Sequence, residues 1–499
     1  MVDDGGPVGL DGVQVAFDDE RVVSDAGIML AATLADRLGI EDLVDGCVRL
    51  GVRGAASCAG RKVMALVYAM ALGADSIDDC QVLRAGRTGR LLGGWIPAPS
   101  TLGTFLRAFT FGHVRQLDRV LAETLKRAWT AGAGPGAGRL TVDVDSFVGE
   151  VHGYAKQGAA FGYTRKGGYH PILASRAESG EVLHLRLRNG SANTQRGILR
   201  FTDELIARVN RAGATGAKLM RADSGFWNAK VFAKREKAGW TYSIGIRMAK
   251  HVGDVIDLID ETAWTTITDY PDSGEAQIAE TLLGDRRLIV RRTRLVGAQA
   301  ELFPDWRHHP FLTNRTDAIA IVEAEHRQHA VVELVIRDLK DQALAHFPSG
   351  QFHANGAWTV IGALAHNLLR WTQLLGAPGK IIRAARTVRR RLLALPGRLT
   401  THAARWTLHL PTRWPWQDDF NTALARLERS PPPPECAGQP EAVQQTTRRP
   451  GAITAARKHP DQCRPSTPAA LDAPTPRSTR HQPHTPAATD AISAVHQLE

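Results

Sequence analysis

Two aspartates stand two residues apart in the stretch VDVDSF. Valines flank both, and a carboxylate among buried apolar side chains costs several kcal/mol unless a partner compensates its charge. Side chains alternate along a strand, so Asp143 and Asp145 should face one side of it, while Leu140, Val142 and Val144 face the core. The pattern predicts a strand that presents two carboxylates along one active edge.

Two further acids lie where later elements could bring them to that edge. Asp223, in RADSGF, follows a second apolar strand, and Glu333, in VELVIRDLK, lies on an amphipathic helix. Neighbouring carboxylates repel one another unless a proton or a cation lies between them. Mg²⁺ is the natural cation for a site made of oxygen atoms. The acids Asp145, Asp223 and Glu333 are therefore candidate metal ligands.

The helix that carries Glu333 also groups basic side chains. Spacings of three, four and seven residues place them on one helical face, which comprises His326, His329, Glu333, Arg337 and Lys340. A face with one acid among basic groups suits a metal ion beside a phosphate. Two histidines and one carboxylate also form transition-metal sites, so a second class of metalloenzyme stays open.

The order of the elements indicates how these residues meet. Three strands are predicted between residues 139 and 189, followed by a helix, a strand, a helix and a strand. Early strands in a meander, with later strands added in parallel, give the strand order of a ribonuclease H-like α/β fold. In this order the first and fourth strands are neighbours, which would bring Asp145 close to Asp223.

Composition changes along the chain suggest five parts. A helical region, which a helix-turn-helix or any small helical domain would explain, ends at the Gly-rich stretch TAGAGPGAG. A segment of short strands precedes the Glu333 helix, and the C-terminal tail is rich in Pro and Thr, a composition typical of disorder. The predicted parts are an N-terminal DNA-binding domain (1–137), a catalytic domain (138–253 and 311–375), a β-rich insertion (254–310), a basic segment (376–430) and a disordered tail (431–499).

Charge favours a polyanionic partner. The net charge is +11, which indicates nucleic acid, although an Arg-rich genome composition would give the same sign. The basic segment holds Arg389, Arg390 and Arg391 near several tryptophans, as a phosphate-binding surface or a solvated basic face would. No apolar run approaches the roughly 20 residues of a membrane span. Five cysteines outside any CxxC pattern favour a cytoplasmic protein over a zinc ribbon.

An ordered set of motifs resembles a known family. LTVDVDSF, GYHPILA, RNGSANT, RADSGF, VELVIRDLK, FHANGAW and ALAHNLLRW follow one another between residues 140 and 372, and DSIDDCQVLRAG, PSTLGTFLRAF and LPTRWPWQDDF flank them. RADSGF alone is weakly specific, whereas the ordered set is specific. The chain resembles the DDE transposases of bacterial insertion sequences, in particular the transposase DDE domain group 1 type, over most of its length except the tail.

The resemblance implies catalytic residues and partners. Asp145, Asp223 and Glu333 match the three acids that bind two Mg²⁺ ions, for which Mn²⁺ can substitute, and Asp143 becomes a supporting acid. Glu333 and Lys340 match a Tyr-Arg-Glu-Lys signature in which His326 replaces Tyr and His329 replaces Arg, and Phe147 replaces a Thr. The implied partners are the terminal inverted repeats, target DNA and further copies of the chain on nucleoid DNA. A DNA-binding protein derived from an inactive transposase is the alternative.

Overall fold

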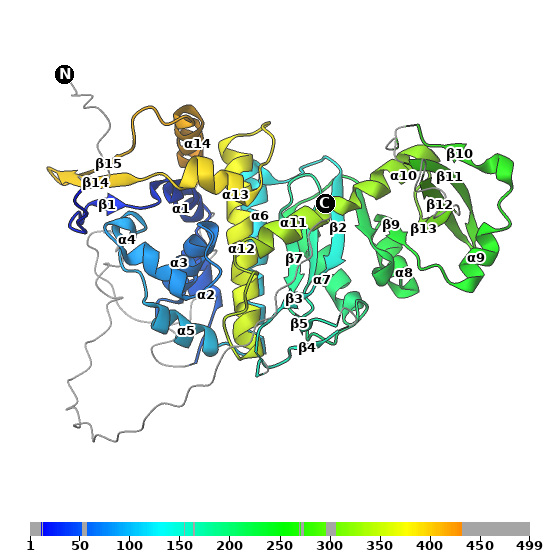
Figure 1. The fold of residues 1–499 in the computed structure, drawn as a ribbon, viewed down its shortest axis with the longest axis horizontal. Helices are drawn as coiled ribbons and strands as arrows, with labels where there is room; N and C mark the ends of the chain where they lie inside the picture. The colour runs from blue at the N-terminus through cyan, green and yellow to red at the C-terminus, as the bar shows by residue number, and fades with distance from the viewer. Residues whose placement is uncertain are drawn as a thin grey trace, which may run out of the picture.

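The computed structural model describes residues 11, 13–51, 57–153, 155–162, 165–268, 270, 274–295 and 306–431. The molecule is elongated, with a helical body at one end, a mixed sheet in the middle and further strands of that sheet at the other end (Figure 1). The predicted tail lies outside the described residues, apart from residue 431. Among the described helices, none is both long enough and apolar enough to cross a bilayer.

The central sheet has the predicted strand order. The five strands of its core run in the order β7-β6-β2-β8-β9. β2 pairs antiparallel with β6 and parallel with β8, and β8 pairs parallel with β9. The ribonuclease H-like α/β prediction is therefore confirmed. The bounds are β2 (Leu140–Ser146), β6 (Ile172–Arg176), β7 (Val182–Arg186), β8 (Lys218–Ala222) and β9 (Thr241–Gly245).

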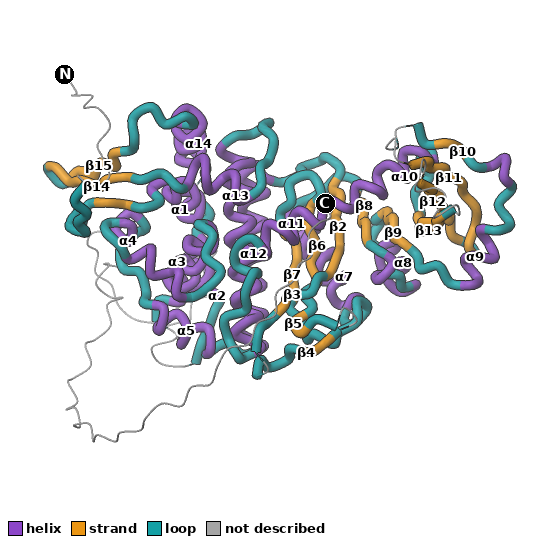
Figure 2. Tube along the Cα trace, in the orientation of Figure 1, coloured by secondary structure: helices purple, strands orange, loops and turns teal. Residues whose placement is uncertain are grey.

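Four more strands extend the same sheet beyond β9. The predicted insertion forms strands, and they continue the sheet in the order β9-β13-β12-β11-β10, all antiparallel (Figure 2). Ile289 of β12, Phe311 of β13 and Val322 of the following helix make a small separate core. The strands are β10 (Thr265–Thr266), β11 (Gly274–Leu283), β12 (Arg286–Leu295) and β13 (Arg307–Thr313).

Helices connect the strands of the central sheet and cover it. The crossovers between parallel strands are α7 (Ile198–Ala212) and α8 (Ala229–Lys237), while α9 (Lys250–Ile256) follows β9. The predicted Glu333 helix is α10 (Ile319–Arg327), a 3₁₀ turn at Gln328–Ala330 and α11 (Val331–Lys340). Val332, Ile336 and Leu339 are buried, as their spacing predicted. A small sheet lies beside β2 and consists of β3 (Gly149–Glu150), β4 (Ala160–Phe161) and β5 (Gly167–Tyr169).

Both ends of the described chain build the helical body. Val22 and Val23 of β1 pair with Arg398 and Gly397 of β14, near the other end of the described chain, so residues before 137 and after 376 share one body. Its N-terminal helices are α1 (Met29–Arg37), α2 (Ile40–Cys47), α3 (Ala59–Ala71), α4 (Thr88–Leu91), α5 (Pro99–Arg107) and α6 (Phe111–Ala128). Its C-terminal elements are α13 (Ala385–Val388), β14 (Gly397–His402), β15 (Arg405–His409) and α14 (Gln417–Arg429).

The long helix α12 (Phe352–Gly376) joins this body to the sheet. It is buried along most of its length and packs against α3, α6, α14 and β7. A buried carboxylate, Glu181, lies at this contact and accepts hydrogen bonds from the indole nitrogens of Trp129 and Trp371. Burial raises the pKa of Glu181, against the opposing effect of Arg176. Glu181, in the turn before β7, is therefore hydrogen-bonded both to α12 and to the end of α6.

We expect Glu181→Ala to destabilise the protein by roughly 2–4 kcal/mol, because it leaves two buried indole N–H groups without an acceptor. The exposed Glu428 on α14 provides the control: Glu428→Ala should stay within about 0.5 kcal/mol of the parent. Thermal unfolding of the three proteins measures the difference. Equal melting temperatures for the two variants would contradict the fastening role.

Candidate active site

A cleft of about 580 Å³ opens where β8 and β9 end, beside β13 and the Glu333 helix. Two predicted catalytic acids and both predicted histidines line it. Arginines that the sequence analysis did not single out line it as well. The polar lining residues are Asp223, Ser224, Arg247, Arg291, His308, His309, Glu323, His326, Arg327, His329 and Glu333.

The register of β2 and β8 explains how two acids meet. Asp143 lies opposite Arg221, and Val144 lies opposite Ala222. One step further along both strands come Asp145, at the end of β2, and Asp223, just beyond β8. The motifs VDVDSF and RADSGF therefore run side by side. Asp143 and Arg221 form an ion pair on one face of the sheet, and two residues further along each strand Asp145 and Asp223 follow on the same face.

The electrostatics of Asp145 link the three acids. Burial, together with the charges of Asp223 and Glu333, raises its pKa to about 6, while the Ser146 N–H and His329 oppose the shift. Asp223 is exposed at the mouth of the cleft, yet the surrounding protein also raises its pKa; the Gly225 N–H hydrogen bond, His329 and Arg247 oppose this shift. The charges of Asp223 and Glu333 therefore both act on Asp145.

Asp143 is paired with protein groups and takes no place among these acids. Its carboxylate is fully buried and accepts two hydrogen bonds from the Arg221 guanidinium, at 2.7 and 2.8 Å. The third partner is Nδ1 of His329, 3.0 Å away. The sequence predicted that Asp143 would face the active edge and support the site through a nearby base, and His329 and Arg221 are the bases it contacts.

His326 is packed against protein groups at the back of the cleft. Its Nδ1 lies 2.8 Å from the Ser243 hydroxyl, and its ring stacks on Phe311 with the centroids 4.0 Å apart. Burial, with help from His329 and nearby arginines, lowers its pKa to about 3. His326 is therefore neutral near pH 7 and brings no positive charge to the cleft. Its predicted contact with DNA stays a prediction.

Arginines also line the cleft, namely Arg247, Arg291 and Arg327. The buried Glu323 accepts hydrogen bonds from Arg291 (3.2 Å) and Arg327 (3.0 Å), which fixes both guanidinium groups, and Arg247 lies close enough to Asp223 to affect its pKa. The sequence analysis missed these residues. The one available signal was the alternation of arginines in RLIVRRTRL, which places Arg291 and the apolar Val290 on opposite faces of β12.

The remaining predicted DNA contacts lie outside the cleft lining. The Lys340 ammonium lies over the Phe147 ring, 5.2 Å from its centroid, and Arg337 is exposed on α11. In the basic segment, Arg389 donates to Gln342 (2.9 Å), Arg390 is exposed and Arg391 stacks over Trp416. Two of these three arginines thus have protein partners, and the DNA contacts of all five residues stay predictions.

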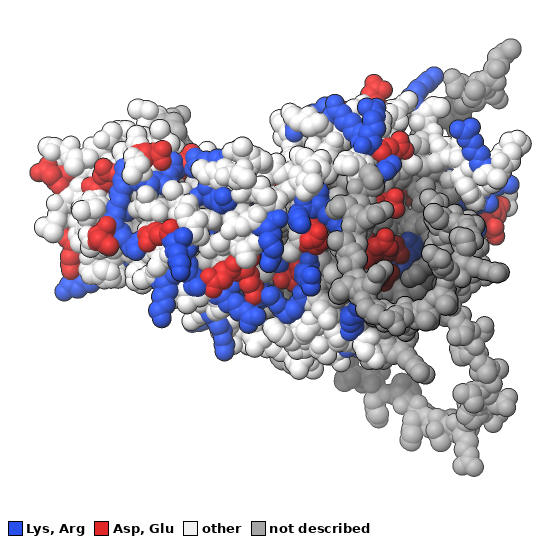
Figure 3. Space-filling view, turned by 180° about the vertical axis from the view of Figure 1, so that it is seen from behind, with Lys and Arg blue, Asp and Glu red and all other residues white. Residues whose placement is uncertain are grey.

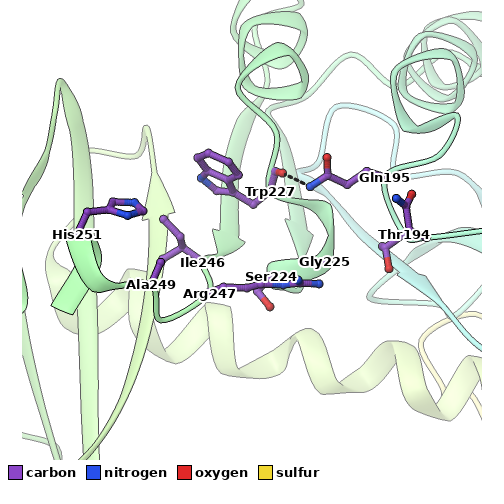
Figure 4. A pocket seen from close by; sticks show the side chains of 10 residues that line it. Thr194, Gln195, Ser224, Gly225, Trp227, Ile246, Arg247, Ala249 and His251 are labelled. Carbon is purple, nitrogen blue, oxygen red and sulfur yellow. Dashed lines mark hydrogen bonds between the residues drawn. The ribbon is translucent and has the colours of Figure 1, made fainter. Parts of the chain in front are cut away.

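A second pocket of about 370 Å³ adjoins the cleft through Ser224, Ile246 and Arg247. Figure 4 shows Trp227 and His251 on its walls, with Thr194 and Gln195 from the loop before α7. The Trp227 carbonyl accepts a hydrogen bond from the Gln195 amide (2.8 Å), which holds this loop against the end of β8. The polar cleft therefore continues into a partly apolar hollow.

The donor groups fit a hard divalent cation. The carboxylates of Asp145, Asp223 and Glu333 offer oxygen ligands of the kind that Mg²⁺ and Mn²⁺ prefer. Among the residues that the structure describes, no three His, Cys, Asp or Glu side chains are gathered closely enough to hold a metal ion. The oxygen chemistry of the three acids suits such an ion.

The fold is that of a ribonuclease H-like α/β protein, with Asp145 and Asp223 at the ends of two adjacent parallel strands. The family model described as transposase DDE domain group 1 matches residues 6–432. The chain therefore belongs to this transposase family.

Comparison with solved structures found a piggyBac transposase synaptic complex with hairpin DNA, at 12% identity. The similarity covers 74% of this chain and 80% of that chain, with a TM-score of 0.42. Comparison with curated protein sequences found no match.

The pKa of Asp145 gives a prediction for the metal-free protein. An unfolded aspartate has a pKa of about 3.9, so the folded state is favoured while Asp145 is protonated and loses stability as the pH rises through about 6. Asp145→Asn is neutral at every pH. In EDTA it should therefore stabilise the protein at pH 8, by on the order of 2 kcal/mol, and have little effect at pH 4. Thermal unfolding at both pH values tests this, with the exposed Asp254→Asn as control; a destabilised Asp145→Asn at pH 8 would contradict it.

The pairing of Asp143 gives a second prediction. Arg221→Met leaves a buried carboxylate without its main partner and should cost roughly 3–5 kcal/mol. Adding Asp143→Asn removes that charge, so the double variant should melt at a higher temperature than Arg221→Met alone. If the two substitutions lower the melting temperature additively, the two side chains are not coupled as described.

Proposed function

We propose that the protein is a DNA transposase that binds the terminal inverted repeats of an insertion sequence and cuts and transfers DNA strands by in-line phosphoryl transfer. The observation that carries this proposal is the pair of strand ends that set Asp145 beside Asp223, with Glu333 near enough to raise the pKa of Asp145. Unpaired acids beside a wall of arginines suit a phosphodiester whose oxygens carry negative charge.

The acids and bases of the cleft have different roles in this proposal. When two Mg²⁺ ions, or Mn²⁺ in their place, are held by Asp145, Asp223 and Glu333, they supply the charge that activates a water or 3′-hydroxyl and stabilises the leaving oxygen. Arg247 and Arg327 bind and orient the phosphodiester. Because Asp143 accepts from Nδ1 of His329, the other ring nitrogen is free to contact a phosphate oxygen or the attacking group.

Positive residues outside the cleft would hold the rest of the DNA. Lys340, whose stem packs by Phe147, supplies a point charge near the cleaved end. Arg337, Arg389, Arg390 and Arg391 are proposed as weaker contacts with the phosphate backbone. The proposed setting is the bacterial cytoplasm, where copies of the chain assemble on nucleoid DNA. A catalytically impaired, DNA-binding descendant of a transposase is the alternative, and the experiment below separates the two.

We expect Asp145→Asn, Asp223→Asn and Glu333→Gln each to abolish cleavage of inverted-repeat DNA, because each removes charge needed to hold the metal ions. DNA binding should survive, since a negative group near phosphate is lost. The assay is strand cleavage across a titration of Mg²⁺ or Mn²⁺, with Asp254→Asn as a control of equal charge change.

Asp143→Asn should keep measurable cleavage, because the structure pairs Asp143 with protein groups. Cleavage by Asp145→Asn together with an inactive, folded Asp143→Asn would reverse the assignment. An inactive parent protein that still binds inverted repeats would favour the impaired alternative.

A further inference from the structure

A two-stranded ribbon projects from the helical body at the end of the molecule opposite the sheet extension (Figure 1). The ribbon consists of β14 and β15, joined by Ala403 and Ala404. β1 is its only strand neighbour beyond the pair in the described chain, and it reaches only Gly397 and Arg398. Beyond these two residues the ribbon has no strand neighbour among the described residues.

The two faces of the ribbon differ in chemistry. Across the pair, Leu399 faces Leu408 and Thr401 faces Trp406, and the two leucines pack in a small core with Val23 and Leu395. The other face carries only polar and basic side chains. In register, these are Arg398 with His409, Thr400 with Thr407, and His402 with Arg405. Residues 397–413 contain no acid.

The body holds the ribbon from its inner face. Arg87 and Arg90 lie over the Trp406 ring, 5.5 and 5.6 Å from its centroid, and Arg87 also donates to the Leu399 carbonyl (2.8 Å). These contacts add two cations beneath the ribbon and fix its direction. The outer face is correspondingly free of such packing: Arg405 is exposed, and Arg398 has one exposed acid, Asp19, at 3.5 Å.

The tip of the ribbon is a tight turn with an unusual sequence. Ala403 and Ala404 both have positive φ, 46° and 62°. This geometry is that of a two-residue hairpin turn, for which Asn-Gly is the favoured sequence. A left-handed conformation costs a residue such as alanine roughly 1–2 kcal/mol. The tip of the ribbon therefore carries only the two small side chains of Ala403 and Ala404. Their left-handed conformation lowers the stability of the fold somewhat.

We propose that the outer face of this ribbon binds duplex DNA, in a groove and along the flanking phosphates, at a distance from the cut site. This inference rests on the proposed function, since it assigns part of the DNA contact to a surface outside the cleft. A two-stranded ribbon fits the major groove, which is about 12 Å wide. Arg398 and Arg405, near the two ends of the outer face, can each reach a phosphate, and the Thr400 and Thr407 hydroxyls between them can contact phosphate or base edges.

Charge complementarity distinguishes the ribbon from other basic surfaces. On the face shown in Figure 3, Lys and Arg side chains are interspersed with Asp and Glu. Such mixed surfaces attract DNA weakly. The outer face of the ribbon instead combines cations and hydroxyls, and the acid that flanks it is Asp19. Its two edges could each follow one strand of a DNA duplex.

The test is the salt dependence of binding to a random-sequence duplex of about 40 base pairs, followed by fluorescence anisotropy. Arg398→Gln with Arg405→Gln should weaken binding roughly 10- to 100-fold near 0.1 M salt and reduce the log–log salt slope by about 1.8, because two phosphate contacts are lost. Arg398→Lys with Arg405→Lys should keep most of the affinity and the slope, since a point charge suffices for a phosphate.

The control removes the same charge elsewhere in the C-terminal part: Arg426→Gln with Arg429→Gln, both exposed on α14, should leave the slope nearly unchanged. Equal slopes for the ribbon variant and this control would overturn the inference, as would a ribbon variant that changes self-association but not DNA binding. Melting temperatures confirm that the variants are folded. The binding probe needs no cleavage, so the two proposals are tested independently. The ribbon inference can be contradicted while metal-dependent cleavage is observed, and cleavage can be absent while the ribbon binds DNA.

Discussion

The buried ion pair between Asp143 and Arg221 fixes the geometry on which the site depends. A slip of one residue between β2 and β8 would put these two charges on opposite faces of the sheet and leave both unpaired in the core, at a cost of several kcal/mol. The pair therefore sets the register of the two strands. In that register, and in no neighbouring one, Asp145 and Asp223 emerge together at the carboxyl ends of the strands.

The same pair positions the helix that carries Glu333. Asp143 also binds His329, and Arg221 donates to the Glu325 carbonyl, so both members hold the segment that precedes α11. At the other end of α11, the buried Asp338 pairs with Arg370 of α12. Ion pairs and hydrogen bonds of the carboxylates Asp143 and Asp338 therefore hold the helix that carries Glu333 at both of its ends. These paired charges stabilise the arrangement in which the like charges of the site acids lie near one another.

Much of this framework could be predicted from local patterns. The alternation of VDVDSF and the polar end of RADSGF predicted both strands, and their order predicted that they are neighbours. The partner of Asp143 could not be predicted, because Arg221 is 78 residues away and a period of two does not say which charged group covers a given face. The expectation that Asp143 supports the site through a nearby base left that base unnamed, and the structure pairs Asp143 with Arg221 and His329.

Other features depended on contacts that no local signal encodes. The pairing of β1 with β14 involves two residues on each strand, too few to leave a pattern, yet it joins the two ends of the chain. The strands after β9 were expected as strands, but their continuation of the central sheet depends on the pairing of Phe311, Leu312 and Thr313 with β9. That pairing carries β12 and β13 to the cleft, where Arg291 forms part of the cationic wall.

Helix α12 connects the central sheet with the helical body through the side chains of residues 366–371. His366 contacts the Gly180 carbonyl, Asn367 bonds both the N–H and the carbonyl of Val182, and Trp371 donates to Glu181. The side-chain amide of Asn367 thereby acts as a strand neighbour for the edge strand β7, which would otherwise leave backbone groups unpaired. Since Arg370 of the same stretch holds Asp338, the helix fixes both the far edge of the sheet and the Glu333 helix. Because α12 packs against both parts, the distance between the ribbon and the cleft is fixed by the fold. DNA that bound to both would therefore lie in one defined position relative to the acids.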